Sequence, residues 1–325
     1  MTAPTPIGTF RIGSQPIKMF GWVPPELRTP DQERKHMQLV GAMPAFSIAG
    51  AYRVDNRKVA LYEARKTIAA AAQPPYIKQL TGSCVGCGGM NAVLTLRDVE
   101  IALKGENERP EMLWWPYTYG ESRQIAGMSG QGEGSFGSAW AEAAKTKGMF
   151  SSSVDGLPQY RMDDGWYVLT REIELKWSDG QQAPAKYDAL AKEHLVQTAA
   201  PCRSPEDVAA ALQNGYPCSI ASMFGTRGPK VMGEPQVAVA EWDDQWAHQQ
   251  FIDAWWDHPQ LGELFRIGNN WGNVHGPQPD GSPLGGYWIR KSVLQRLCSD
   301  RGTEIYAFSG LNGFPARQLP SSWMF

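Results

Sequence analysis

The sequence predicts an α+β protein in which helices fill the first half of the chain and strands the second. Segments with strong helix formers and a helical apolar stripe are concentrated before residue 150, and short apolar or alternating runs follow from residue 166. Since helices precede strands instead of alternating with them, a segregated α+β arrangement is favoured over a parallel βαβ sheet. A chain of 325 residues buries a large core without disulfides.

Four segments of the first half have the composition and apolar period of helices. They are residues 59–72, 90–103, 110–124 and 138–147. The pattern is clearest in 90–103, where Val93 and Leu96 share one face. Pro74 and Pro75 end the first helix, and Gly148 ends the last. Residues 1–30, rich in Pro, Gly and Thr, predict an extended arm or a loop lying on another surface.

The second half predicts five strands and one helix. The strands are residues 166–175, 217–223, 251–256, 264–268 and 286–290. Residues 204–214 predict the helix, with Ser204 as N-cap, Pro205 at its first position and Asn214-Gly215 as its stop.

Charge and composition exclude several classes of function. The net charge of −2, with acids and bases interspersed, gives no reason to expect nucleic-acid or membrane binding. No apolar run is long enough for a signal peptide at the N-terminus or for a membrane span elsewhere. Five irregularly spaced cysteines make a poor disulfide framework, although one bridge such as Cys202–Cys218 remains open. Since there is no second C-x-x-C and no H-x-x-H, we expect neither a metal nor a cofactor.

A loop of small residues, 81–89 (TGSCVGCGG), leads directly into a helix. It places Cys84 and Cys87 at a helix N-terminus, where unpaired N–H groups and the helix dipole lower a thiol pKa. A thiolate formed near neutral pH is a nucleophile. Two alternatives stay open: buried core cysteines, and a C-x-x-C redox site, although the strand that should precede such a site is missing.

A histidine and an asparagine follow the cysteines in chain order. His248 opens an apolar strand-like run, whereas His258 and His275 lie in loops and are expected to be more exposed, and His194 lies on a polar helix. Asn269 follows the strand 264–268.

A hairpin through residues 257–263 would bring Asn269 beside His248. The Asn oxygen then accepts the imidazole N–H and fixes the tautomer, while Trp271 covers the bond. Cys, His, Asn is the order of a cysteine hydrolase triad. A simple turn at Asn269-Asn270 is the alternative.

Seven short motifs together resemble those of the papain-like cysteine peptidases, and more closely their bacterial and phage members. In chain order they are 81–86 (TGSCVG), 112–123, 132–149, 207–219 (DVAAALQNGYPCS), 247–248 (AH), 269–272 (NNWG) and 285–290 (GGYWIR). The resemblance covers about residues 75–310.

This resemblance implies a two-lobed fold, with a helical lobe that carries the Cys and an antiparallel β-sheet or barrel lobe that carries the His and Asn. It implies Cys84 as nucleophile, His248 as general base and acid, and Asn269 as the residue that orients the imidazole. Gly134 would let substrate backbone approach closely. We expect an N-terminal arm and helix in residues 1–70, the papain-like domain in 71–310 and a tail in 311–325.

The chain departs from the family pattern at two places near the nucleophile. The family has a Gln six residues before the Cys as an oxyanion donor, but Lys78 stands there and the nearest candidate is Gln79. Cys87 also fits the plant-type pattern and remains an alternative nucleophile. The first 60–70 residues lack the long charged helical pattern of the family's inhibitory pro-segment.

Two functions follow from these observations. The first is a cysteine endopeptidase or amidase acting on a peptide or protein substrate. The second is a papain-like scaffold with a structural role in an assembly such as a phage particle, suggested by the displaced Gln, the arm, the apolar tail and a surplus of aromatic residues suited to interfaces. The tryptophans of that surplus are Trp114, Trp115, Trp255, Trp256 and Trp323. Either function is compatible with a cytoplasmic or virion-associated protein, with protein partners for the arm and tail.

Overall fold

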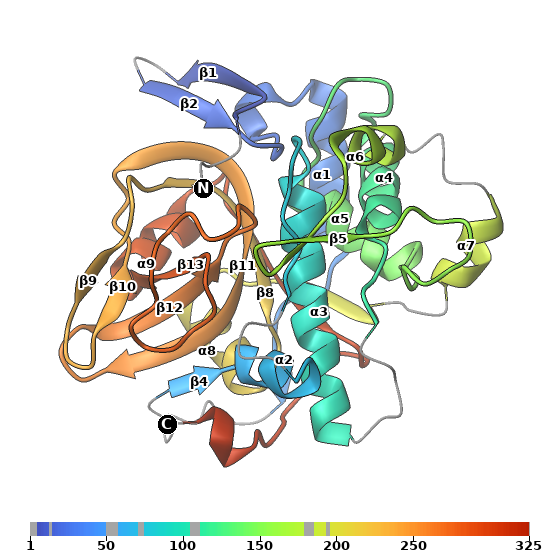
Figure 1. The fold of residues 1–325 in the computed structure, drawn as a ribbon. Coiled ribbons are helices and arrows are strands. Elements are labelled where there is room, and N and C mark those ends of the chain that lie inside the picture. Colours follow the sequence, from blue (N-terminus) through green and yellow to red (C-terminus); the bar gives the residue numbers. More distant parts are fainter. Residues whose placement is uncertain are drawn as a thin grey trace.

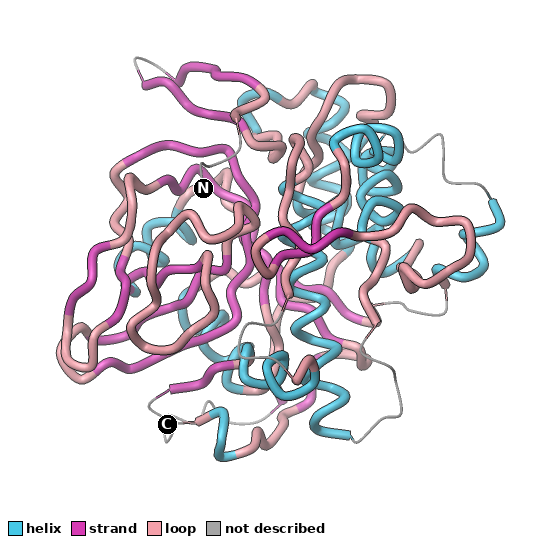
Figure 2. The backbone as a smooth tube through the Cα atoms, viewed as in Figure 1, coloured by secondary structure: helices cyan, strands magenta, loops and turns pink. Residues whose placement is uncertain are grey.

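The computed structural model describes residues 5–12, 15–49, 58–70, 75–104, 111–178, 185–192 and 196–324. Most of the helices before residue 192 lie on one side of the long helix α3 (Cys84–Lys104), and the large sheet lies on the other side together with the helices of residues 205–213 and 291–299 (Figures 1 and 2). The predicted α+β class is therefore confirmed, and so is the two-lobed arrangement. The His194 and Pro74 positions named above lie outside the described residues.

The described helices are mostly short, and α3 is the longest. They are α1 (Pro30–Ala42), α2 (Tyr62–Ile68), α3 (Cys84–Lys104), α4 (Trp115–Ala126), α5 (Gly137–Thr146), α6 (Arg171–Ser178), α7 (Ala185–Ala191), α8 (Pro205–Gln213) and α9 (Lys291–Ser299). Two 3₁₀ turns, η1 (Pro25–Leu27) and η2 (Ser321–Trp323), lie in the terminal segments. No helix within the described ranges is long and apolar enough to cross a membrane.

Most strands belong to one mixed sheet whose path is β7-β14-β8-β11-β12-β13-β10-β9, with β2 and β4 also paired to β11. The strands on this path are β7 (Thr198–Pro201), β8 (Cys218–Gly225), β9 (Lys230–Met232), β10 (Val237–Val239), β11 (Asp244–His258), β12 (Gly262–Gly268), β13 (Gly286–Arg290) and β14 (Glu304–Ser309). The N-terminal strands are β1 (Gly8–Ile12), β2 (Gln15–Met19), β3 (Ile48–Ala49) and β4 (Lys58–Ala60), and the small pairs are completed by β5 (Arg161–Asp163), β6 (Trp166–Val168) and β15 (Phe314–Pro315).

The two lobes share one hydrophobic core along α3. Nearly every residue of the first three turns of this helix is buried, because α3 packs against β11 on one side and α4 on the other. The five tryptophans that we expected at interfaces are all buried in the protein's own core. That expectation was wrong, because burying the large apolar area of these rings in the core stabilises the fold.

Two predicted elements differ from the observed ones. The alternating run 166–175 forms a strand only over β6, and α6 starts at Arg171 because Thr170 accepts the Ile173 N–H at the helix start. A local cap therefore overrides the alternation. The predicted helix 59–72 is divided into β4, which pairs with β11, and the short α2.

Other predicted elements are confirmed with shifted ends. Ser204 caps α8 as predicted by accepting the Asp207 N–H. The hairpin through residues 257–263 joins β11 and β12, with His258 opposite Gly262. β11 is longer than expected, so that His248 lies inside the strand. His258 is buried at its end and bonded to the Pro235 carbonyl, so the expected exposure of His258 was wrong.

Candidate active site

Cys84 is the first residue of α3 and lies on the interface between the two lobes. The thiol is fully buried, and its Sγ accepts the backbone N–H of Gln249 at 3.3 Å. Gln249 lies on β11 directly after His248. Residues 80–83, called the nucleophile loop after the role that the sequence predicts for Cys84, thus bring the thiol against the strand that carries the histidine.

His248 and Asn269 are joined across the β11–β12 hairpin. The distance from His248 Nε2 to Asn269 Oδ1 is 2.9 Å, and the Asn270 N–H donates to the same oxygen at 2.8 Å. Because a backbone N–H only donates, the Asn269 amide must present its oxygen here. His248 Nε2 therefore carries the proton, and Nδ1 holds the lone pair. The Trp271 ring stacks on His248 with centroids 4.6 Å apart.

A second imidazole completes the hydrogen bonding of Asn269. Asn269 Nδ2 lies 2.7 Å from His275 Nε2, which must accept because the amide nitrogen donates. The sequence placed His275 in an exposed loop, but it is only partly exposed and its ring contacts Trp246, Trp271 and Tyr287. No sequence motif marked this contact.

Gln79 reaches the same interface although it precedes Cys84 by five residues instead of six. Its Nε2 donates to the carbonyls of Phe20 and Thr81 at 3.1 and 2.9 Å, and its Oε1 accepts from Asn270 Nδ2 at 3.3 Å. A buried amide with a fixed orientation is thereby held beside the thiol-bearing helix.

The cleft between the lobes is filled by the protein's own residues 19–23, here called the plug. The Phe20 N–H donates to the Ala247 carbonyl at 3.0 Å. The Phe20 ring lies edge-on to His248, with centroids 5.7 Å apart, and 4.5 Å from the centroid of Trp271. Cys84 and His248 are therefore closed to solvent.

The plug also pairs with the loop that precedes α5. The Val23 N–H donates to the Ser135 carbonyl, and the Ser135 N–H donates to the Gly21 carbonyl, both at 2.9 Å. A Cβ at Gly134, whose φ is +114°, would lie 3.0 Å from Val23. At Gly21, a Cβ would lie only 2.0 Å from the Gly82 carbonyl oxygen. Glycine is required at both positions because two backbones meet there.

A buried ion pair anchors the plug to the β-sheet lobe. Glu304 on β14 accepts from Trp22 Nε1 at 3.0 Å, from the Ser138 N–H at 2.7 Å and from the Arg28 guanidinium. Neither Arg28 nor Glu304 is marked by a sequence motif, because their partners lie far away in the chain. Coulombic attraction to Arg28 keeps the pKa of Glu304 low in spite of its burial.

Burial dominates the protonation states of the thiol and the imidazole. It raises the pKa of Cys84 to about 12 and lowers the pKa of His248 to about 3, with the Asn269 hydrogen bond opposing the latter shift. The lowered thiol pKa that the sequence predicts is therefore wrong for this closed state. These two pKa shifts keep both the thiol and the imidazole neutral. Within the described part of the chain, His248 Nδ1 has no hydrogen-bond partner, so it is not bonded to the thiol.

Cys87, one helical turn after Cys84, has a different environment. Its Sγ lies 3.7 Å from Ser83 Oγ, and both burial and the nearby Glu174 carboxyl raise its pKa. Neither His248 nor Gln249 bonds to its sulfur among the described residues. This environment favours Cys84 over Cys87 as the thiol that meets the histidine strand.

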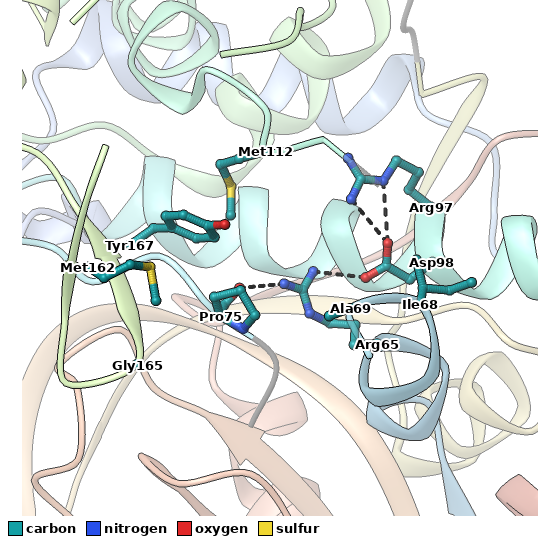
Figure 3. Close-up of a pocket in the computed structure, with 10 residues that line it drawn as sticks. All are labelled: Arg65, Ile68, Ala69, Pro75, Arg97, Asp98, Met112, Met162, Gly165 and Tyr167. Carbon is teal, nitrogen blue, oxygen red and sulfur yellow. Dashed lines mark hydrogen bonds and ion pairs between the residues drawn. The ribbon is translucent and has the colours of Figure 1, made fainter. Parts of the chain in front are cut away.

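A cavity of about 380 Å³ lies away from these residues, between α2, α3 and the β5–β6 hairpin (Figure 3). Its arginines are already engaged, since Arg65 donates to the Pro75 carbonyl and both Arg65 and Arg97 pair with Asp98. Across the residues described, no group of three His, Cys, Asp or Glu side chains is arranged to hold a metal.

The helical lobe, the sheet lobe and the interface between them have the fold of the papain-like cysteine proteases. The structure is similar to xylellain, a cysteine protease from Xylella fastidiosa, with a TM-score of 0.53 and 13% identity over 96% of this chain and 98% of that one. It is also similar to a procathepsin B from Trypanosoma congolense, with a TM-score of 0.52 and 11% identity over 82% of each chain. No protein-family profile and no curated protein sequence matches the chain.

Proposed function

We propose that the protein is a cysteine hydrolase of peptide or amide bonds, with Cys84 as nucleophile, His248 as general base and acid, and Asn269 as the orienting residue. One observation carries the proposal. The fold brings three residues that are far apart in the chain to one buried interface, where the Cys84 thiol accepts a hydrogen bond from the strand that carries His248, and His248 Nε2 is bonded to Asn269. Only Nδ1 remains to exchange a proton with the thiol.

The chemistry proceeds in two balanced steps. His248 Nδ1 takes the Cys84 proton, the sulfur bonds to the substrate carbonyl carbon, and the imidazolium gives its proton to the departing amine. Water then loses a proton to His248, attacks the thioester and releases the acid and the thiol. Gln79 Nε2 and the Cys84 backbone N–H are the donors that we assign to the developing oxyanion.

The plug must leave before substrate enters. The Phe20 carbonyl already takes the Gln79 donor, and the plug backbone already pairs with Ser135. An extended peptide would use the same partners after displacement of the plug. When water returns, the burial that raises the thiol pKa and lowers the imidazole pKa is relieved, so that His248 can take the Cys84 proton as the sulfur attacks the substrate.

The test compares hydrolysis of a fluorogenic peptide library by the purified full chain and by two matched variants. We expect Cys84→Ala to reduce turnover to background, whereas Cys87→Ala keeps activity within about threefold, because only Cys84 meets His248 and Asn269. Activity that survives Cys84→Ala contradicts the assignment. No activity in any chain, even with the plug displaced, favours the structural scaffold.

Lowering the pH is expected to loosen the plug. His248 has a lowered pKa in the closed state, so protons bind preferentially once the cleft opens. The closed state is most stable above the ordinary His pKa of 6.5. Between this pH and about 3, its free-energy advantage over the open state falls by about 1.4 kcal/mol for each pH unit of acidification.

Amide hydrogen exchange of residues 20–23, corrected for intrinsic rates, measures this. We expect protection to fall by about tenfold for each pH unit below about 6. Protection that is independent of pH in this window contradicts the explanation. The amides of β12 serve as the internal control, since they lie outside the plug.

A further inference from the structure

A buried carboxyl that the proposed chemistry does not use lies directly beneath the nucleophile loop. Glu174 on α6 is fully buried. Its carboxylate accepts the Leu80 N–H with both oxygens at 3.2 Å, the Thr81 hydroxyl at 2.7 Å and the Ser83 hydroxyl at 3.0 Å. Its hydrogen bonds to the described residues therefore come from the four residues that precede Cys84.

No cation compensates this carboxyl among the residues that the structure describes. Arg171, one turn earlier on α6, is directed to the outside, where it bonds to the Leu80 carbonyl and pairs with Glu133. A buried acid held only by neutral donors costs free energy to ionise, so its presence at this position calls for a function other than stability.

The remaining loop residue is held from the opposite side. The Gly82 N–H donates to the Glu133 carboxylate, and the Gly82 carbonyl accepts the Tyr119 hydroxyl at 2.7 Å. Each residue of the loop is thus fixed by at least one side chain from the helical lobe. Glu174 alone holds three of the four, which makes it the residue that sets the position of the turn entering α3.

The carboxylate also acts differently on the two cysteine thiols. Cys87 lies against Ser83 on the Glu174 side, and the negative charge of Glu174 adds to burial in raising the thiol pKa of Cys87. Cys84 accepts the Gln249 N–H, and Glu174 is not among the causes of its pKa shift. A charge at Glu174 therefore disfavours a thiolate at Cys87 and leaves Cys84 to the histidine strand.

We propose that Glu174 is a positioning residue for the proposed cysteine hydrolase: its buried carboxyl holds the nucleophile loop in the geometry that presents Cys84, and its ionisation switches that geometry. This inference rests on the proposed function, which it deepens. The ionised carboxylate only accepts, and matches the N–H and two hydroxyls around it. The protonated acid has a proton of its own to donate, so that the hydroxyl of Thr81 or Ser83 must rotate to accept it, and a charge-assisted hydrogen bond to the loop becomes a weaker neutral one.

This ionisation falls in the physiological range. Burial raises the pKa of Glu174 to about 7, and the hydrogen bonds from Thr81, Leu80 and Ser83 oppose the shift. Among the described residues, its charge acts on Cys87 and Tyr160, both neutral because burial raises their pKa values. The buried cation on α4, which packs against α6, is Arg123, whose guanidinium donates to the Ser178 and Met128 carbonyls. Glu133 and Arg171 pair with each other on the far side of the loop. The hydrogen bonds between Glu174 and the nucleophile loop are therefore expected to change near neutral pH.

The test uses Glu174→Gln in the full chain, with Glu172→Gln on the exposed face of the same helix as the matched control. Gln is isosteric and mimics the protonated acid at every pH. We expect the Leu80 amide resonance to titrate near pH 7 in the wild type and in Glu172→Gln, but not in Glu174→Gln. For peptide hydrolysis at about pH 8, we expect Glu174→Gln to lower kcat by about tenfold with KM unchanged, because the side chain lies under the loop and not in the cleft.

A third variant makes the test quantitative. Thr81→Val keeps the shape of the side chain but removes one donor that lowers the Glu174 pKa, so the Leu80 titration should move to higher pH. A Leu80 amide that does not titrate, or a Glu174→Gln profile that superimposes on the wild type, overturns the inference. The outcome of Cys84→Ala is separate: loss of the proposed function removes the kcat effect for every variant, whereas the Leu80 titration still tests the hold on the loop.

Discussion

Replacing His248 by Ala is expected to lower kcat for peptide hydrolysis by about a thousandfold with little change in KM. The imidazole performs both proton transfers of the proposed reaction, and general acid–base groups contribute on this scale. Because the ring lies on the sheet side of the thiol and beneath the plug, its loss removes chemistry and not substrate contacts.

His258→Gln is the matched control for this variant. His258 is on the same strand and is equally buried, but its ring bonds to the Pro235 carbonyl at the far end of β11. We expect His258→Gln to change the stability of the fold. Its kcat should stay within about threefold of the wild-type value. Equal losses of kcat in both variants would indicate a general effect of unfolding β11 and would remove His248 from the mechanism.

Replacing Phe20 by Ala is expected to open the cleft. Removing a buried Phe ring costs about 3 kcal/mol, and here that cost falls on the closed state, because the ring contacts His248 and Trp271 only while the plug is in place. The rate at which an epoxide thiol reagent labels Cys84 should therefore rise by about a hundredfold. Intact-mass spectrometry over time measures this rate.

Phe46→Ala tests whether the effect belongs to the plug. Phe46 lies in the same N-terminal part of the chain but packs against Phe314, with ring centroids 5.0 Å apart, and does not touch His248. It should leave the labelling rate near that of the wild type. If Phe46→Ala accelerates labelling as much as Phe20→Ala does, general loosening of the N-terminal segment explains the result and the plug has no special role.

Much of the fold was predictable because local patterns and tertiary packing agree. Ser204 and Pro205 start α8 by ordinary capping, and the apolar stripe of residues 90–103 is the buried face of α3. Prediction was wrong where a distant partner decides the outcome. β4 is a strand because β11, far away in the chain, pairs with it, and that partner is not visible in a local window of sequence. At α6 the error was a local one: the Thr170 side chain accepts the Ile173 N–H and starts a helix in a run of alternating residues.

The candidate site shows the same division. Cys84, His248, Asn269 and Gln79 have recognisable spacing and motifs, and the structure brings all four to one interface. Its supporting residues had no such signal, since Phe20, His275, Glu174 and Glu304 act through partners that are distant or in irregular segments. The protonation states were also out of reach, because they depend on the burial that the plug creates.

In the proposed reaction the Cys84 sulfur becomes acylated, and this thioester can be trapped. The Phe20→Ala chain is mixed with a peptide ester, quenched in acid within the first turnover and digested for peptide mass spectrometry. We predict one acyl group, which fragmentation of the peptide assigns to Cys84 and not to Cys87, and none in a Cys84→Ser control. An acyl group carried by Cys87, or a chain that hydrolyses the ester without any acylated cysteine, would contradict the account.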